Sequence, residues 1–401
     1  MLAGSDDARI RGTLARRPSP VSDAVVADEL VEPWFSCLLS RVPGLHIFDC
    51  HTHFGSDPDG SRLTAGELRR ALDVIDARAV VFPLATTGGY RAANDLALAA
   101  AEAADGQLVA FCRVDPYTDG IAEVERSLTH GAAGIKLHPR AERFLLGDPA
   151  VRRIFALANE RRVPVIVHAG RGIPSLGRDA LDLAERFPAA PLILAHAAVA
   201  DLAWIWSQAA ANPNLFFDTA WWNTADLLAL FVLVPPGQIL FASDTPYGRP
   251  VAAAAIALRV ALAVGLTGAQ TAAVFGGQLM RLLAHEAAHD LGPAQVGTAS
   301  TPGPLLERLH TLLVAAAACS MRAQPAEEFL DLARLACHLP GEHPDAVVSA
   351  SILDLLNRHE RYLATRPAQD DPRPAGVHLI LVAAAIARLP DPPLPNWGTC
   401  A

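Results

Sequence analysis

Short apolar runs and helical patterns alternate along residues 46–250. Each run is followed by a segment with apolar positions three or four apart, the signature of a βα repeat. The runs are uninterrupted rather than alternating, as expected for a parallel sheet covered on both faces. The predicted strands are His46–His53, Ala79–Pro83, Gln107–Val114, Gly134–His138, Val163–His168, Leu192–His196, Leu215–Thr219 and Ile239–Asp244. Eight such units favour a (β/α)₈ TIM barrel over residues 44–291 rather than a doubly wound sheet.

The chain continues on both sides of the predicted barrel. Residues 1–43 are expected to be a polar lead-in with a short helix around Asp28–Leu39 that packs outside the barrel. Residues 292–304 have the Gly, Pro, Ser, Thr and Ala composition of a linker. Residues 305–390 are predicted to form a small all-α C-terminal domain. Its four helical patterns cover Pro304–Cys319, Ala326–Leu339, Asp345–Leu363 and Gly376–Leu389.

Composition narrows the range of functions. The 33 basic residues against 42 acidic ones give a net charge of −9, which offers no basic surface for nucleic acid. The first twenty residues lack the apolar core of a signal peptide, and no apolar stretch has the length of a membrane span. Six widely spaced cysteines are typical of reduced thiols. We therefore expect a cytoplasmic protein with a small-molecule partner, neither nucleic acid nor membrane, and an oligomeric state that stays open, homo-oligomer included.

Several predicted strands end in histidine or aspartate. His51 and His53 lie two positions apart at the end of the first strand and so face the same side. His168 ends the fifth strand, His196 the sixth and Asp244 the eighth. The carboxyl ends of barrel strands open on one rim, where barrel enzymes carry their active sites. Imidazole and carboxylate groups that converge there suit Zn²⁺ and similar cations.

Lys136 is the only lysine of the chain, so the other 32 of the 33 basic residues are arginines. It lies at the end of the fourth predicted strand and faces the same interior as His138. An isolated ammonium group is costly to bury, so a lysine here must be neutral, paired or covalently changed. It could bridge two metal ions as a carbamate, orient a carboxylate ligand or hold an anionic substrate.

Together these motifs resemble the amidohydrolase superfamily, in particular its amidohydrolase-related branch of metal-dependent TIM-barrel hydrolases. The motifs that match are Asp49–His53, Gly134–Pro139, His168, His196 and Ser243–Pro246. They span about half of the chain, and only their combination is specific.

The resemblance implies a ligand set and roles. One divalent ion, usually Zn²⁺, would be bound by His51, His53, His168 and Asp244. Asp244 would also take a proton from the attacking water, and His196 would polarise the substrate or stabilise the developing oxyanion. A second ion is implied only if Lys136 is carbamylated.

The implied reaction is hydrolysis, in which activated water attacks a carbonyl-type carbon of an amide, lactone or ester-like bond. The superfamily also contains non-oxidative decarboxylases of aromatic or enoic acids with the same ligands. Those enzymes typically follow the sixth-strand histidine with a glycine-containing turn and an acidic residue, whereas Ala197–Asp201 follows His196 here. Decarboxylation is therefore the alternative, and a non-catalytic barrel that retains the site as a scaffold is a third interpretation.

Two further groups of residues are candidates for chemistry. Substrate contacts are expected from His138, Arg171 and Trp221, with Arg140, Arg249, Tyr247 and Trp222 also placed on the rim. The HExxH motif His285–His289 lies on a predicted helical stretch, but Gln295 stands where the longer protease pattern has its third histidine. We interpret this motif as the polar end of a helix before the linker.

Overall fold

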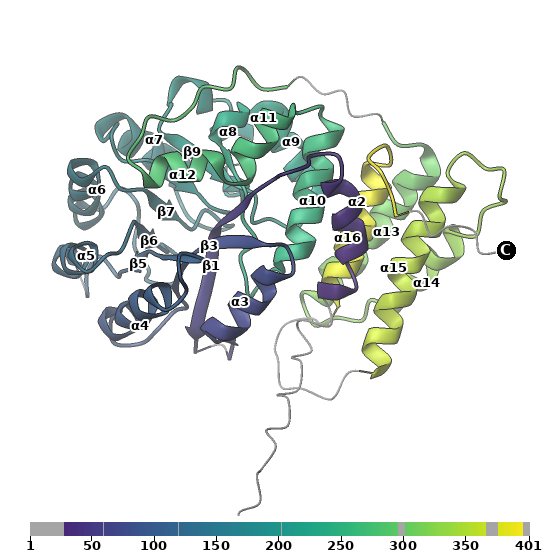
Figure 1. The fold of residues 1–401 in the computed structure, drawn as a ribbon, viewed down its shortest axis with the longest axis horizontal. Coiled ribbons are helices and arrows are strands. Elements are labelled where there is room, and N and C mark those ends of the chain that lie inside the picture. Colours follow the sequence, from purple (N-terminus) through teal and green to yellow (C-terminus); the bar gives the residue numbers. More distant parts are fainter. Residues whose placement is uncertain are drawn as a thin grey trace, which may run out of the picture.

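A barrel of parallel strands surrounded by helices forms one part of the molecule, and a group of helices packs against its side (Figure 1). The structure, a computed structural model, describes residues 28–58, 60–118, 120–201, 203–295, 301–365 and 376–395. Most of the predicted lead-in, residues 1–27, and residues 296–300 of the predicted linker lie outside the described residues.

The barrel strands lie where the apolar runs predicted them. They are β1 (Ile47–Ser56), β3 (Ala77–Pro83), β4 (Leu108–Ala110), β5 (Cys112–Arg113), β6 (Ile135–Leu137), β7 (Val165–Val167), β8 (Leu192–Leu194), β9 (Leu215–Asp218) and β10 (Ile239–Leu240). β4 and β5 form one predicted strand that is interrupted at Phe111. Among the described strands, the one antiparallel addition is β2 (Arg62–Leu63), which pairs with the end of β1.

The two ends of the strand order meet and close the barrel. The described strands follow the orders β2-β1-β3-β4 and β10-β9-β8-β7-β6-β5. The N–H of Cys50 donates to the carbonyl of Phe241 at 2.9 Å, and the N–H of Asp244 donates to the carbonyl of His51 at 2.9 Å. These bonds join β1 to the chain that follows β10, and the predicted (β/α)₈ barrel is confirmed.

Helices alternate with the strands and cover the outside of the barrel. They are α3 (Ala65–Asp73), α4 (Arg91–Glu102), α5 (Gly120–Thr129), α6 (Pro149–Arg161), α7 (Leu176–Arg186), α8 (Ala203–Trp206), α9 (Thr224–Leu233), α10 (Pro250–Ala263), α11 (Gly268–Ala272), η4 (Ala273–Gly277) and α12 (Gln278–Leu283). α3 begins with a capping box, in which Thr64 and Glu67 each accept the backbone N–H of the other residue. None of the helices in the described part of the chain combines the length and apolar character needed to cross a membrane.

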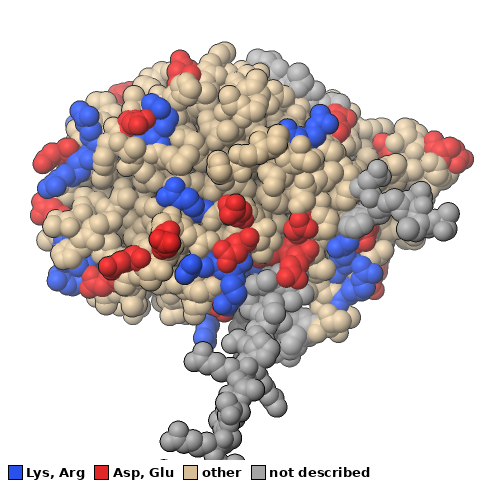
Figure 2. Space-filling model, in the orientation of Figure 1, with Lys and Arg blue, Asp and Glu red and all other residues tan. Residues whose placement is uncertain are grey.

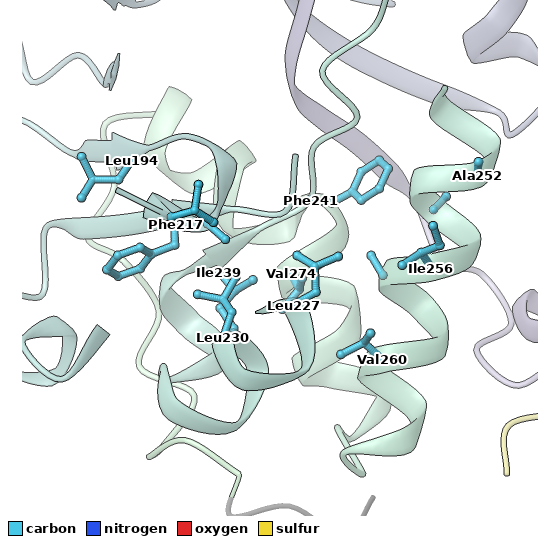
Figure 3. Close-up of a cluster of buried hydrophobic side chains, with 14 of the residues drawn as sticks. Leu194, Phe217, Leu227, Leu230, Ile239, Phe241, Ala252, Ile256, Val260 and Val274 are labelled. Carbon is cyan, nitrogen blue, oxygen red and sulfur yellow. The ribbon is translucent and has the colours of Figure 1, made fainter. Parts of the chain in front are cut away.

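The uninterrupted apolar strands fill two separate cores. In β7, Val165 and Val167 pack outward against the helices, whereas Ile166 points into the barrel interior. Figure 3 shows part of the outer core, where Ile239 of β10 lies beside Leu230 of α9. Side chains therefore alternate between the two cores, and this alternation fixes which residues at the strand ends face the interior.

In the described part of the chain, five further helices lie beside the barrel. They are α2 (Glu32–Leu39), α13 (Pro304–Ser320), α14 (Glu327–Ala336), α15 (Ala346–Thr365) and α16 (Val377–Arg388). α16 is apolar around most of its circumference, as expected of a buried helix, and packs against α10, α13 and α15. α2 packs on α10, and its Trp34 donates an indole N–H to Ser351 of α15 at 2.9 Å. Acidic and basic side chains are interspersed over the face shown in Figure 2.

Candidate active site

A cavity of about 680 Å³ opens at the carboxyl ends of the barrel strands. Its volume lies within the range of small-molecule sites. Most of the residues proposed from the sequence line it, namely His53, His138, His168, His196, Asp244, Arg171 and Trp221. His51 and Lys136 are fully buried beneath them.

His51, His53 and Asp244 form a compact group at the base of this cavity. One ligand atom from each lies within 4.8 Å of the others. The Nε2 atoms of His51 and His53 are 3.2 Å apart, and Oδ1 of Asp244 lies 3.2 Å from each of them. Ligands held 2.0–2.1 Å from a tetrahedral zinc ion are about 3.3 Å from one another, so the residues fit such an ion.

A β-bulge turns both histidines into the barrel. Phe48 and Cys50 already point into the interior core, so a regular strand would direct His51 and His53 outward. The register of β1 against β3 shifts between Asp49 and Thr52, and this extra residue reverses the alternation. The HxH pair faces the cavity only because of this bulge.

Asp218 fixes the tautomer of His51. The Nδ1–H of His51 donates to Oδ2 of the buried Asp218 at 2.7 Å, which leaves the lone pair of Nε2 directed at His53 and Asp244. Burial lowers the pKa of both histidines well below the ordinary value, so they are neutral. Neutral imidazole is the form that binds metal ions.

Asp49 joins the two chain segments that carry these ligands. Its Oδ1 accepts the N–H groups of His51 at 2.9 Å and of Ser243 at 3.1 Å. Burial raises the pKa of Asp49 to about 7. The carboxyl group thus holds the end of β1 against the turn that presents Asp244.

Lys136 reaches the same group from β6. Its Nζ lies 3.1 Å from Nε2 of His51 and 4.7 Å from the centre of the Phe82 ring. Ile135 and Leu137 pack in the outer core, so Lys136 between them faces the interior, as predicted. Burial lowers the pKa of its ammonium group to about 8.

His168 and His196 contact each other. The Nδ1 of His196 donates to the carbonyl of Ala220 at 2.8 Å, and its Nε2 therefore accepts the Nδ1–H of His168, also at 2.8 Å. The ring of His168 stacks on His138 with centroids 3.8 Å apart. His168 thus stands in the cavity but outside the group formed by His51, His53 and Asp244, and its role as a metal ligand stays a prediction.

A tight turn places His196. By strand alternation His196 would point outward, because Ala195 packs in the interior core. Residues 196–198 instead have left-handed φ angles of 57°, 53° and 52°, which are unfavourable for residues with a side chain. Oδ1 of Asp218 accepts the N–H of His196 at 2.7 Å and of Ala220 at 3.0 Å, and so stabilises this turn.

Asp218 and Arg113 are two site residues that were not predicted from the sequence. Asp218 ends β9 and Arg113 ends β5, and each follows an apolar residue of the interior core by two positions. The same placement singled out Asp244, so it could have identified both residues. Arg113 lines the cavity and forms a buried ion pair with Glu142 at 2.7 Å, and Glu142 also accepts the hydroxyl of Tyr90 at 2.5 Å.

The cavity entrance contains further guanidinium groups. Arg171 lies over the ring of Trp221, 5.4 Å from its centre, and the indole N–H of Trp221 donates to Asp226 at 2.7 Å. Arg140 lines the same entrance. Among the described residues, no carboxylate forms an ion pair with Arg140 or Arg171. The entrance therefore has positive charge available for an anionic group.

The HExxH motif does not lie on a helix, and that expectation was wrong. α12 ends at Leu283, and His285 has a left-handed φ of 59° in the turn that follows. Its Nδ1 bonds the carbonyl of Arg162 at 2.9 Å, and Glu286 pairs with Arg281 at 2.9 Å. A zinc-binding HExxH needs both histidines on one helix face. Because α12 ends at Leu283, before the motif begins, the two histidines do not have this geometry.

The sequence of residues 48–283 matches the amidohydrolase family. The chain belongs to the amidohydrolase family. The matched segment covers more than half of the chain, contains every candidate ligand and ends before α13 begins. No curated protein matches the chain.

Solved structures resemble part of this chain at low sequence identity. The 5-carboxyvanillate decarboxylase from Sphingomonas paucimobilis is 15% identical, with 60% of this chain and 99% of that chain covered and a TM-score of 0.48. A 2,6-dihydroxybenzoate decarboxylase from Rhizobium gives the same four values. A 4-oxalomesaconate hydratase from Rhodopseudomonas palustris is 17% identical, with 60% and 96% covered and a TM-score of 0.45.

Proposed function

We propose that this amidohydrolase-family chain is a metal-dependent hydrolase that attacks a carbonyl-type carbon of a small molecule, in an amide, lactone or ester-like bond. The observation that supports it is the convergence of His51, His53 and Asp244 within 4.8 Å beneath an open cavity. When bound, a divalent cation such as Zn²⁺ acts as a Lewis acid and lowers the pKa of water. One ion, a cytoplasmic location and a small-molecule substrate belong to the same proposal.

Asp244 is the proton acceptor in this proposal. Its Oδ1 faces the two imidazoles, whereas Oδ2 lies 3.9 Å from Nδ1 of His196. Burial raises the pKa of Asp244, and the ammonium group of Lys136 opposes this shift. Lys136 thereby favours the ionised carboxylate that a general base requires.

His196 is the partner of the substrate oxygen. Its Nδ1–H is held by the carbonyl of Ala220, so a proton received by the ring must go to Nε2. A doubly protonated ring can then donate from Nε2 to an oxygen that becomes negative during the reaction. The stacked pair of His138 and His168 limits the space beside this ring.

Decarboxylation of a carboxylic acid at the same centre is the second candidate. The observation that favours it is the pair of entrance arginines, Arg140 and Arg171, which have no ion-pair partner among the described residues. A guanidinium group without a carboxylate partner is suited to bind the carboxylate of a substrate. The same arginines also suit a hydrolase whose substrate or product is anionic.

One set of assays tests both candidates. The purified chain is stripped with a chelator, reloaded with Zn²⁺ or Mn²⁺, and incubated with lactones, N-acyl amides and aryl esters, and separately with hydroxybenzoic acids. Hydrolysis that requires the added metal and is lost in His53→Ala supports the proposal. Metal-dependent release of CO₂ without hydrolysis replaces it with the decarboxylase. Activity that withstands both chelation and His53→Ala, or a chain that binds no metal, overturns both.

A further inference from the structure

The candidate cavity is not formed by the barrel alone. Met321, which follows α13, and Val377, His378 and Leu381 of α16 are among its lining residues. All four lie beyond residue 283, where the match to the amidohydrolase family ends. The helices beside the barrel therefore take part in the site, although they lie outside the segment that matches the family.

α16 is held firmly against the barrel. Its buried face includes Leu379, Ile380 and Ala383, and it packs on α10. α10 in turn supplies Ala252, Ala253 and Ile256 to the cavity. The first two turns of α16 and one face of α10 thus form a continuous wall.

A buried arginine fixes the far end of this wall. Arg259 of α10 is 2% exposed and donates to the carbonyls of Leu389, Pro392 and Pro393, at 2.8, 3.2 and 2.9 Å. These carbonyls come directly after α16. The position of α16 over the cavity is therefore set by hydrogen bonds as well as by apolar packing.

The two sides of the cavity differ in chemistry. The strand ends contribute histidines, Asp244 and guanidinium groups, whereas the helical side, apart from His378 of α16, contributes aliphatic side chains. These are Ala252, Ala253, Ile256, Met321, Val377 and Leu381. A carbonyl group at the metal centre would occupy only a small part of about 680 Å³, so the cavity has room for a substrate that extends to this aliphatic wall.

We propose that α16, together with α10 and Met321, forms an apolar subsite that selects substrates by their non-reacting alkyl or acyl group. The proposal rests on the proposed function for the position of the reacting end. The occupant is an amphipathic small molecule with a carbonyl or carboxylate group at one end and a hydrocarbon chain at the other. Leu381 and Val377 determine how much each methylene of that chain contributes to affinity.

The test measures binding of straight-chain carboxylates, from butanoate to octanoate, to the zinc-loaded full chain by isothermal titration calorimetry. Burying one methylene raises affinity by about fourfold, so the wild-type affinity should rise steeply along the series. Leu381→Ser should lower the ratio of octanoate to butanoate affinity at least tenfold. Leu335→Ser is the matched control, because Leu335 is 68% exposed on α14 and does not line the cavity.

Val377→Thr provides a second variant that nearly preserves side-chain shape and should lower the same ratio in the same direction. Circular dichroism checks that each variant is folded. A wild-type affinity that does not rise with chain length, or a Leu381→Ser protein that keeps the full rise, overturns the subsite. A chain that binds longer acids more tightly but hydrolyses none of the lactones, amides and esters supports the subsite and contradicts the proposed function. If wild type and Leu381→Ser both turn over short-chain and long-chain esters equally well, the result supports the proposed function and contradicts the subsite.

Discussion

Nδ1 of His51 and Oδ2 of Asp218 lie 2.7 Å apart, although 167 positions separate the two residues. The other oxygen of Asp218 accepts the backbone N–H groups of His196 and Ala220. One buried carboxylate thus orients the ring of a candidate metal ligand and the turn that presents His196. Asp218 is not itself a candidate ligand, yet its hydrogen bonds set the positions of His51 and His196.

We expect Asp218→Asn to weaken Zn²⁺ binding by about 10- to 100-fold. The two backbone N–H groups require an acceptor, so the carbonyl of the new amide faces them and its NH₂ group faces His51. Nδ1 of His51 must then accept a hydrogen bond, and the proton moves to Nε2, where it blocks the lone pair needed for the metal. Competition with a chromophoric chelator measures the affinity. Asp182→Asn is the control, because Asp182 pairs with Arg186 on the surface of α7. An unchanged affinity in Asp218→Asn would contradict this role.

The sequence predicts the barrel well because burial on two faces leaves a strong local signal. Uninterrupted runs such as Val165–Val167 can be recognised without knowledge of the fold, and Lys136 was placed correctly because its neighbours are apolar. The four helical patterns after residue 303 correspond to α13–α16 for the same reason. Local periodicity is sufficient wherever an element packs along its whole length.

The site depends on features that have no local signature. The bulge between Asp49 and Thr52 and the left-handed turn at His196 each reverse the direction of a histidine, and both depend on partners far away in the chain. The assignment of HExxH to a helix was wrong because the residues after Leu283 bond to Arg162 and Gln278 instead of continuing α12. The contribution of Leu381 to the cavity likewise depends on how α16 docks on α10.

Lys136 should be unreactive in the folded protein. It is fully buried beneath the cavity, with its Nζ 3.1 Å from Nε2 of His51. Acetic anhydride at pH 8 should therefore modify the N-terminal amine but not Lys136, whereas in guanidinium chloride Lys136 should also be modified. Because the chain has a single lysine, peptide mass spectrometry assigns the product without ambiguity. Acetylation of native Lys136 as fast as in the unfolded chain would show that the amine is accessible.

Arg259→Met should lower the free energy of unfolding by about 2 kcal/mol. The substitution leaves the carbonyls of Leu389, Pro392 and Pro393 without their donor, although removal of a buried charge offsets part of this loss. Urea unfolding followed by circular dichroism measures the change. Arg308→Met, an exposed position on α13, should stay within about 0.5 kcal/mol of wild type. Equal stabilities of the two variants would exclude a docking role for Arg259.

Acid should destabilise the chain through His359 of α15. Burial, aided by the positive charges of Arg334 and His378, lowers the pKa of His359 to about 4, whereas an unfolded histidine has a pKa of about 6.5. Below about pH 6.5 the histidine binds a proton in the unfolded chain but stays neutral in the folded chain. The free energy of unfolding therefore falls between about pH 6.5 and 4, and the contribution of His359 is fully present above that range. The expected loss from this residue is about 3 kcal/mol.

His359→Gln should remove that part of the pH dependence. His338→Gln, at an exposed position after α14, should retain it. Urea unfolding of the three proteins at pH 7.5, 6 and 4.5 provides the comparison, and the difference between His359→Gln and wild type should change steadily across the series. Because α15 packs against α16, the same acid destabilisation acts on the helix that lines the cavity. Parallel stability curves for wild type and His359→Gln would place the acid sensitivity in another group.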